Sequence, residues 1–380
     1  MAAACRRPAL GAVAARRRAR VRPDARRVVG ACRAGRAVRR AAAGDRRAGA
    51  GRTPRPARAA RRGRDDPRDR VARGAGRVRP RGRAVSGRDR VVRAAPAKIN
   101  LVLDLLGPRE DGYTEIATVF QTVELADTVR VTLDRDGDDA THLEVRPRAP
   151  CPDERNLAVL AARAYRTASG LSGTIAIELD KRIPDGAGLG GGSSDAAAVL
   201  LALERLSGTP LGAERLAALA AGLGADVPYF LVGGLAVGRG RGEQVAALDD
   251  LAPRPVVLAR VDEPLPTAEV YRRARAGLTP CADPPNIRRF FRYLEEGAAG
   301  RPPVFNALER AAAALRPGIP RLVERLARLG GRAAMTGSGS AVFALFEDDE
   351  SARAAARDLA RREPDAWIEV TRTLPRGVRG

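Results

Sequence analysis

The sequence predicts an α+β protein of two domains that follows a long basic extension. Its 380 residues are enough for two ordinary domains. After residue 91, strand-like and helix-like patterns are mixed without a strict β–α repeat, which favours α+β over a doubly wound parallel sheet. A proline-flanked break at residues 253–255, after which the pattern restarts, divides a domain over 91–252 from one over 253–375.

The first 90 residues differ sharply in composition from the rest. They contain 30 Arg, 6 Asp and neither Lys nor Glu, whereas the remaining 290 residues carry 38 basic and 39 acidic side chains. The net charge of +23 therefore belongs to the extension, and the remainder is almost neutral. Because the extension has almost no large apolar residues, it cannot bury enough surface to offset chain entropy, and we predict that it is disordered.

Several origins of the extension are open. Ser86 is its only serine and it has no uninterrupted apolar stretch, so a transit peptide and a secretory signal are both disfavoured. A basic arm that contacts RNA, DNA or acidic lipid fits the charge. We favour translation of upstream message from a start codon placed too early, so we expect the native chain to begin near residue 91.

Composition also excludes other function classes. The most apolar later stretch, residues 217–237, contains Asp226 near its middle. A central Asp costs about 2.5–3.5 kcal/mol on insertion scales, so no membrane span is predicted. His142, the only histidine, lies in a polar strand-like run, so it is predicted to be solvated, and a histidine zinc site is excluded.

Cysteine usage indicates a reducing compartment, the bacterial cytoplasm rather than a plastid. No pair of cysteines has the spacing of a metal site or a CxxC motif. The cysteines are Cys5, Cys32, Cys151 and Cys281. We expect a monomer or homodimer whose partners are small molecules, without a specific nucleic acid and without a membrane.

Apolar periodicity predicts the elements in order. Alternation predicts a strand at 97–106, and shorter strand-like runs follow at 128–133, 142–145 and 173–179. Helical patterns cover 156–169, 193–206 and 212–222. The second domain is predicted to contain a strand at 256–261, helices near 267–276, 286–296, 304–315 and 319–329, a hairpin-like pair at 332–335 and 341–346, a helix at 350–361 and a strand at 367–374.

The strongest functional signal is the run IPDGAGLGGGSSD at residues 183–195. Five of the seven residues in 186–192 are glycine. Glycine allows positive φ and close backbone approach, so successive N–H groups can converge on an anion. The following helix adds its free N–H groups and positive dipole end, which predicts a phosphate cradle. Ser193 and Ser194 are predicted to cap this helix, contact phosphate or reach a magnesium ion.

Two known nucleotide-binding patterns fit this run less well. It contains G-x-G-x-x-G, but a dinucleotide fold places an acidic residue about 20 residues on at a strand end, and here Glu204 lies inside the predicted helix. It also lacks the lysine of a Walker A loop. A flexible linker is the structural alternative, although a linker would not lead directly into a well-patterned helix.

Lysine usage gives a second signal. Lys98 and Lys181 are the only lysines among 68 basic residues. An ammonium fits where a planar guanidinium cannot, so both are candidates for function, against the ordinary alternative of surface lysines. Asp226, in the run GADVPYF, is costly among apolar residues unless it is paired, although it could also cap or turn the chain before a proline. Paired with Lys98, it is a candidate for orienting an attacking hydroxyl.

The run MTGSGS at residues 335–340 is a small-residue turn between two predicted strands. Two readings are open. It is either an ordinary hairpin turn or a segment of the second domain that lines the phosphate region.

Together these motifs resemble the GHMP small-molecule kinases. The glycine loop is similar to their ATP-binding motif, and residues 336–340 are similar to their C-terminal glycine motif. Within that superfamily, the sequence resembles the 4-diphosphocytidyl-2-C-methyl-D-erythritol kinases of the non-mevalonate isoprenoid pathway more than the other members. This resemblance extends over about residues 94–346. The runs that carry this are PAKINL at 96–101, DGY at 111–113, TVFQ at 118–121, NL at 156–157 and GADVP at 224–228.

The resemblance implies an S5-like ATP domain and a ferredoxin-like second domain, with the site between them. It implies phosphoryl transfer from ATP, with Mg²⁺, to the 2-hydroxyl of a cytidyl substrate. A homoserine or mevalonate type of GHMP kinase is the nearest alternative. A nucleic-acid-binding protein that acts through its basic extension is the alternative from another class.

The resemblance also implies individual roles. Lys98 and Asp226 would form the catalytic pair, Asn100 would position the substrate, and Tyr113 and Tyr271 would sandwich the cytosine ring. Further substrate contacts would come from Thr114, where the family usually has His, and Thr267. The nucleotide would be bordered by Pro184, Gly186, Gly188, Leu189, Gly190, Gly191, Gly192, Ser193, Ser194, Asn156 and Lys181, with Ser194 as the candidate magnesium ligand.

Overall fold

The computed structural model of the chain describes residues 88–147, 153–261, 264–276, 278, 280–281 and 283–377. All of them belong to one compact unit. The predicted disordered extension lies outside the described residues except at its end, where the boundary at residue 90 is wrong. Strand β1 begins at Arg88, because residues 88–90 pair with residues 132–134 of a neighbouring strand. Backbone pairing of this kind needs no apolar side chain, so composition did not reveal it.

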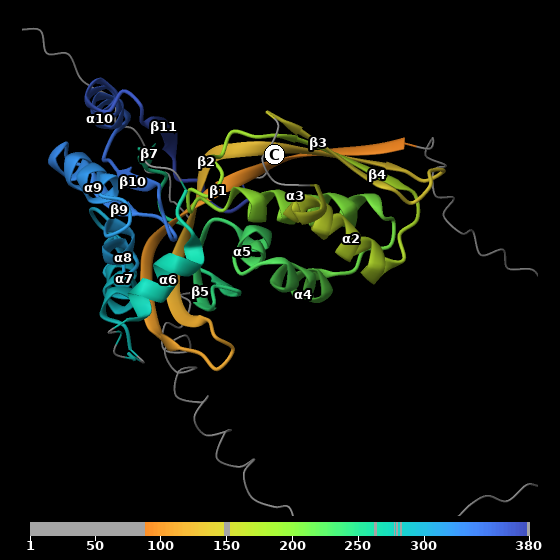
Figure 1. Cartoon of the computed structure of the whole chain (residues 1–380), viewed down its shortest axis with the longest axis horizontal. Coiled ribbons are helices and arrows are strands. Elements are labelled where there is room, and N and C mark those ends of the chain that lie inside the picture. The colour runs from red at the N-terminus through yellow and green to blue at the C-terminus, as the bar shows by residue number, and fades with distance from the viewer. Residues whose placement is uncertain are drawn as a thin grey trace, which may run out of the picture. The chain divides into compact units, whose positions relative to one another are not determined.

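A seven-stranded sheet is built around one long antiparallel pair, β1 (Arg88–Pro108) and β2 (Thr114–Asp134) (Figure 1). The strand order is β3-β4-β2-β1-β8, and β5 and β6 extend from the other half of β2. The shorter strands are β3 (Thr141–Arg146), β4 (Thr174–Asp180), β5 (Leu235–Gly240), β6 (Gln244–Ala247) and β8 (Phe305–Asn306).

The first half of β2 was missed by sequence periodicity for a physical reason. Residues 116–123 are all buried, so apolar and polar positions do not alternate there. A strand covered on both faces loses the period of two that identifies a half-buried strand. His142, in contrast, is exposed on β3, which confirms the prediction of a solvated strand residue.

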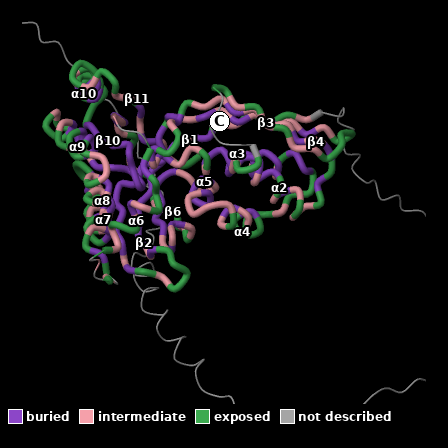
Figure 2. The backbone as a smooth tube through the Cα atoms, in the orientation of Figure 1, coloured by how far each residue is buried: buried purple, intermediate pink, exposed green. Residues whose placement is uncertain are grey.

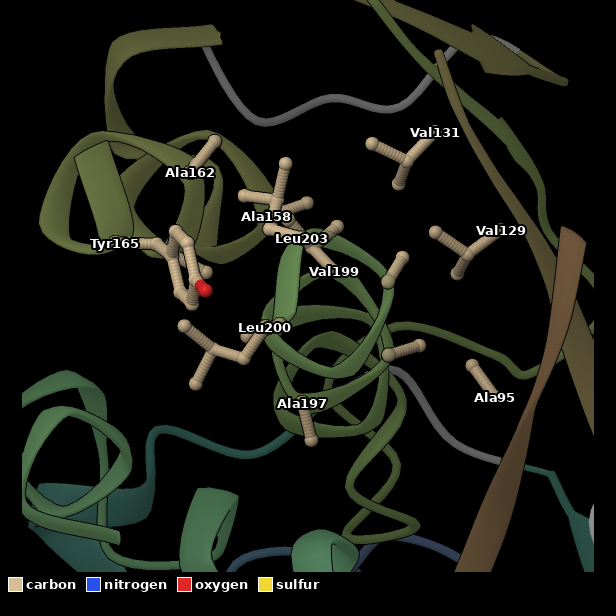
Figure 3. Close-up of a cluster of buried hydrophobic side chains, with 14 of the residues drawn as sticks. Ala95, Val129, Val131, Ala158, Ala162, Tyr165, Ala197, Val199, Leu200 and Leu203 are labelled. Atoms are coloured by element: carbon tan, nitrogen blue, oxygen red, sulfur yellow. The ribbon is translucent and has the colours of Figure 1, made fainter. Parts of the chain in front are cut away.

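Four helices cover one face of this sheet, and the third of them packs mainly on the other helices rather than on the strands (Figure 1). They are α2 (Leu157–Ser169), α3 (Gly191–Leu206), α4 (Ala213–Leu223) and α5 (Val227–Val232), and a 3₁₀ turn at Asp153–Arg155 precedes them. Figure 3 shows Val129 and Val131 of β2 facing α2 and α3, where Ala158 and Val199 are fully or almost fully buried. Small residues on these helices let them approach the sheet closely.

The second sheet has four antiparallel strands in the order β11-β7-β10-β9. These are β7 (Pro255–Arg260), β9 (Arg332–Met335), β10 (Val342–Leu345) and β11 (Trp367–Arg372). The helices of this half are α6 (Thr267–Arg275), α7 (Pro285–Glu295), α8 (Glu309–Ala313), α9 (Gly318–Arg328) and α10 (Asp349–Arg362).

This second sheet is buried on both faces, which joins the two halves. Val256 and Leu258 of β7 pack with Ile99 of β1, whereas the alternate residues Val257 and Ala259 pack in a cluster with α9 and α10. Figure 2 shows buried backbone gathered where β1 and β2 meet the strands of the second sheet. The α+β class is confirmed.

One predicted helix is corrected. Residues 304–315 do not form a single helix, because Phe305 and Asn306 pair in parallel with Val102 and Leu103 of β1 and only then does α8 begin. This strand belongs to the first sheet although it lies in the second half of the chain, so the division at residues 252 and 253 stays a prediction. No helix among the described residues is long and apolar enough to span a bilayer.

Candidate active site

Both halves of the chain line one cavity of about 900 Å³. The glycine loop before α3 and the Lys98 region of β1 meet α6 and the turn between β9 and β10 there. Fourteen of the predicted site residues border this cavity: Lys98, Asn100, Tyr113, Thr114, Pro184, Gly186, Gly188, Gly190, Gly191, Gly192, Ser193, Asp226, Thr267 and Tyr271. Gly337 and Ser338 border it too, so the turn at 335–340 lines the same cavity as the glycine loop.

Lys98 and Asp226 form an ion pair at this cavity. The Lys98 Nζ lies 3.4 Å from Asp226 Oδ2, and the exposed fractions of the two side chains are 3% and 32%. Asp226 occupies the N-cap position of α5, yet among the described residues its side chain makes no capping hydrogen bond. The carboxylate is therefore held by a buried ammonium and open to the cavity, the arrangement that a group receiving a substrate proton needs.

Irregular strand pairing directs Lys98 and Asn100 toward the cavity. The β1–β2 register shifts between Pro96 and Lys98 and again between Asn100 and Val102. Bulges of this kind re-aim side chains. Lys98 Nζ donates to Asn100 Oδ1 at 2.6 Å, and its ammonium also lies 5.7 Å from the centre of the Phe120 ring.

Helix α3 begins earlier than predicted. It starts at Gly191, and Gly190 is its N-cap in the left-handed region at φ 75°, so neither Ser193 nor Ser194 caps it. A Cβ on Gly190 would lie 2.9 Å from Phe230 Cζ and 3.1 Å from Lys98 Cγ, which leaves no room for another residue. The loop is tied to β1 by the Lys98 N–H, which donates to the Leu189 carbonyl at 2.9 Å. Leu189 itself is buried in the core.

The two serines after the glycines point to different places. Ser193 borders the large cavity. Ser194 is 2% exposed, and its hydroxyl donates to the Pro96 carbonyl at 2.8 Å. Ser194 borders a separate cavity of about 90 Å³. The Ser194 hydroxyl therefore has a backbone partner, and Ser193 is the one of the two serines that borders the large cavity, while the magnesium role of Ser194 stays a prediction.

Lys181 lies in a buried ion triad and does not border the large cavity. Its Nζ is 2.5 Å from Asp127 Oδ2 and 2.6 Å from Asp195 Oδ2, and the two carboxylate side chains are 0% and 3% exposed. Asp127 Oδ1 also accepts the N–H groups of Arg182 and Ile183. A Cβ on Gly191 would lie 3.4 Å from this Nζ, so the ammonium lies close to the first residue of α3.

The triad shifts the pKa values of its members in a consistent way. Burial, followed by the negative charge of Asp127, raises the pKa of the Asp195 carboxyl to about 7 although the Lys181 charge opposes this. Burial disfavours the Lys181 ammonium, yet the two carboxylates outweigh it and raise its pKa. The pKa of Asp195 is raised chiefly by burial, whereas the pKa of Lys181 is raised because one ammonium faces two carboxylates.

Asn156 has a structural partner as well. It is the N-cap of α2, and its Oδ1 accepts the Ala158 N–H at 2.9 Å. The next residue, Leu157, borders the cavity. Asn156 itself is not among the residues that border the cavity, so its contact with the nucleotide stays a prediction.

Aromatic and basic side chains also border the cavity. Tyr113 is 54% exposed, whereas burial raises the pKa of Tyr271. Among the described residues the Thr114 hydroxyl is buried without a hydrogen-bond partner. Thr267 and Ser338 share a hydrogen bond of 2.8 Å.

Sequence reasoning missed two arginines that border the cavity. The Arg241 guanidinium lies 4.8 Å from the centre of the Tyr113 ring, and Arg275 donates to the Gly112 carbonyl at 2.7 Å. Arginine is abundant in this chain, so no sequence signal separated these two from the rest.

Comparisons with known proteins agree with this geometry. Residues 156–234 match the model of the GHMP kinases N terminal domain, and residues 283–365 match that of the GHMP kinases C terminal domain. A 4-diphosphocytidyl-2-C-methyl-D-erythritol kinase of Pelotomaculum thermopropionicum is 40% identical over 283 residues, which cover 74% of this chain and 96% of the relative.

Two solved structures are similar in fold. A crystal structure of 4-(cytidine 5'-diphospho)-2C-methyl-D-erythritol kinase is 41% identical with a TM-score of 0.62, over 74% of this chain and 99% of that chain. A homoserine kinase of Cytophaga hutchinsonii has a TM-score of 0.59 at 19% identity, over 77% of this chain and 96% of that chain. At that identity the second likeness concerns the fold alone.

Proposed function

Because the chain belongs to the GHMP kinases, and within them to the family of 4-diphosphocytidyl-2-C-methyl-D-erythritol kinases, we propose that it transfers the γ-phosphoryl group of ATP to the 2-hydroxyl of that substrate. The reaction belongs to non-mevalonate isoprenoid precursor synthesis. The observation that carries the proposal is the Lys98–Asp226 pair, which borders the same cavity as the glycine loop.

In this mechanism the substrate oxygen attacks the γ-phosphorus while the bond to the bridging oxygen of ADP breaks. Phosphoryl transfer depends mostly on positioning and charge stabilisation, so Asp226 needs to take the hydroxyl proton only as the new P–O bond forms. Lys98 lies 3.4 Å from Asp226 and offsets charge that develops at the transferred group. The proton leaves Asp226 for solvent, to which the carboxylate is open.

The glycine loop is suited to the triphosphate. Its positive-φ glycines and the start of α3 present backbone N–H groups, which bind anions without a side chain. Magnesium bound to the triphosphate would neutralise part of its charge. Ser193 and Asp226 are two of the hard oxygen donors that border the cavity, and they would suit this ion. The described residues contain no cluster of three His, Cys, Asp or Glu side chains arranged as a metal site, so the phosphates would supply most ligands.

The cytidyl group fits the aromatic side chains of the cavity. Tyr113 and Tyr271 offer aromatic faces, and Thr114, whose hydroxyl is buried without a partner among the described residues, stands where the family usually has His. Base–aromatic stacking contributes about 1–3 kcal/mol per base.

An acceptor screen tests the proposed function. ADP release is measured with the cytidyl substrate, homoserine, mevalonate and cytidine-free polyols, and we expect turnover with the cytidyl substrate alone. Tyr113→Ala should raise KM for that substrate while KM for ATP stays unchanged. Faster turnover of homoserine or mevalonate than of the cytidyl substrate would show that the chain has a different GHMP kinase activity. The nucleic-acid hypothesis is tested separately, by comparing RNA and DNA binding with and without residues 1–87.

A further inference from the structure

The Lys98 ammonium is held by a hydrogen bond to the side-chain amide of Asn100. Asn100 Oδ1 accepts from Lys98 Nζ at 2.6 Å and from the Gly337 N–H at 2.9 Å. The Thr336 hydroxyl, from the same turn as Gly337, is a third and longer donor to this oxygen at 3.3 Å. Asn100 Nδ2 donates to Thr118 Oγ1 at 2.8 Å, which fixes the plane of the amide. The direction of the Lys98 ammonium therefore depends on where the Gly337 N–H lies.

Gly337 belongs to the turn between β9 and β10, and this turn is in close contact with the reacting groups. A Cβ on Gly337 would lie 3.1 Å from Lys98 Nζ and 2.9 Å from the Gly188 carbonyl. The neighbouring Thr336 hydroxyl accepts the Asn100 N–H at 3.1 Å. A small displacement of the turn would consequently move the Lys98 ammonium or the glycine loop.

Asn306 holds this turn in place. Its Nδ2 donates to the Met335 carbonyl at 2.8 Å and to the Gly337 carbonyl at 2.9 Å, so both amide hydrogens are used on the turn. Its Oδ1 accepts the Leu308 N–H at 2.9 Å, and the residue is 5% exposed.

Asn306 is also attached to the strand that carries Lys98. It pairs with Leu103 of β1, and the next residue, Ala307, donates its N–H to the Leu103 carbonyl at 2.8 Å. The turn is thus hydrogen-bonded to Asn306, which pairs with β1, and to Asn100, which lies on β1. Asn306 is not one of the described residues that border the cavity. It therefore cannot act by contacting the substrate.

We propose that Asn306 is a positioning residue for phosphoryl transfer: through the Met335–Gly337 turn and Asn100, it sets the Lys98 ammonium relative to Asp226. The proposal rests on the proposed function only for the role of the Lys98–Asp226 pair. A misplacement of about 1 Å at a reacting group costs up to about 100-fold in rate. The effect should fall on kcat, because Asn306 touches neither ligand.

The experiment compares Asn306→Ala with Asn286→Ala in the full-length protein. Asn286 is a matched control, because its Nδ2 also donates to a β1 residue, Asp104, at 2.8 Å but not to the turn. We expect kcat to fall about 10- to 100-fold in Asn306→Ala, with both KM values within about twofold of wild type. Asn286→Ala should keep kcat within about twofold. Both variants should melt at lower temperature, since Asn306→Ala loses three buried hydrogen bonds and Asn286→Ala loses one that is partly buried.

A spectroscopic readout separates this proposal from the proposed function. With only two lysines in the chain, selective ¹⁵N-lysine labelling gives one ammonium signal for each, assigned with Lys98→Arg. Asn306→Ala should shift the Lys98 signal and leave the Lys181 signal unchanged, and Asn286→Ala should move neither. This holds even if the cytidyl substrate is not the acceptor.

The proposal is overturned if folded Asn306→Ala keeps wild-type kcat and an unmoved Lys98 signal, or if Asn286→Ala loses as much kcat. Should Asn306→Ala not fold, Asn306→Asp is measured against the same thresholds. It keeps the side-chain volume and the oxygen that accepts the Leu308 N–H, and it removes the amide donors to the turn.

Discussion

The two lysines of this chain occupy opposite electrostatic surroundings. Lys98 faces one carboxylate, Asp226, at 3.4 Å, and that carboxylate is 32% exposed. Lys181 faces two carboxylates at 2.5 and 2.6 Å, and both are buried. A single, longer and solvent-open pair can be rearranged when a substrate arrives, whereas a tight buried triad cannot be opened without leaving charges uncompensated. The first arrangement suits chemistry and the second suits structure.

The glycine loop lies between the two lysines. A Cβ on Gly190 would approach the Lys98 side chain to 3.1 Å, and one on Gly191 would approach the Lys181 Nζ to 3.4 Å. Consecutive glycines therefore contact a catalytic candidate on one side and a structural centre on the other. The comparison predicts that variants of Lys98 and of Lys181 fail in different ways.

Removing the Lys98–Asp226 pair should have the largest effect. Lys98→Ala and Asp226→Asn should each lower kcat by about 10²–10⁴-fold, since each removes a proton acceptor or a charge needed in the transition state. Lys98→Arg should fail as well, because a planar fork does not fit an ammonium site. Steady-state kinetics with circular dichroism melting checks this, and a folded Lys98→Ala enzyme within tenfold of wild-type kcat would remove the pair from the mechanism.

Lys181→Met should mainly lower stability, in contrast to the Lys98 variants, which should mainly lower kcat. It leaves Asp127 and Asp195 buried without their cation, so the free energy of unfolding should fall by about 3–5 kcal/mol. Urea unfolding measures this loss. If Lys181→Met instead keeps its stability and loses only turnover, Lys181 contacts the nucleotide directly and the comparison of the two lysines is wrong.

Gly190→Val should weaken ATP binding while both lysines keep their charges. The new side chain would overlap Phe230 and the Lys98 stem in a left-handed backbone conformation, and overpacking of this kind costs about 1–3 kcal/mol. This corresponds to about 5- to 150-fold in affinity. Equilibrium binding of a non-hydrolysable ATP analogue decides, with Gly222→Val as a control at a helical glycine whose Cβ would meet no atom within 4 Å. An unchanged dissociation constant would mean that the phosphates bind elsewhere.

The smallest effect concerns the pH dependence of stability. The pKa of Asp195 is raised to about 7, above its unfolded value of about 4, so its contribution is full below pH 4 and is lost as pH rises to about 7. Asp195→Asn keeps a partner for Lys181 and removes this titration. The melting temperature of the variant relative to wild type should therefore rise by a few degrees between pH 4 and pH 7 and stay level above. A constant difference across this range would show that Asp195 stays ionised.

Local sequence signals gave the long, periodic elements and the phosphate loop. Helices α2, α3, α4, α9 and α10 lie within two residues of their predicted bounds, because each has an apolar face at helical spacing. The glycine loop could be recognised because positive φ is a local requirement of the backbone. The continuous burial of β2, the short strand β8 and helix α5 had no such signal, since their form depends on what covers them.

The sequence by itself determined which residues could do chemistry: two lysines, an aspartate among apolar residues and a run of glycines. Only the tertiary structure decided which lysine borders the cavity and which lies in the buried triad, that the Ser194 hydroxyl donates to Pro96, and that Asn306 is hydrogen-bonded to the turn next to Lys98. The physical reason is distance along the chain. Asn100 and Gly337 are 237 positions apart, and a hydrogen bond at that separation is set by how two sheets pack rather than by any local pattern.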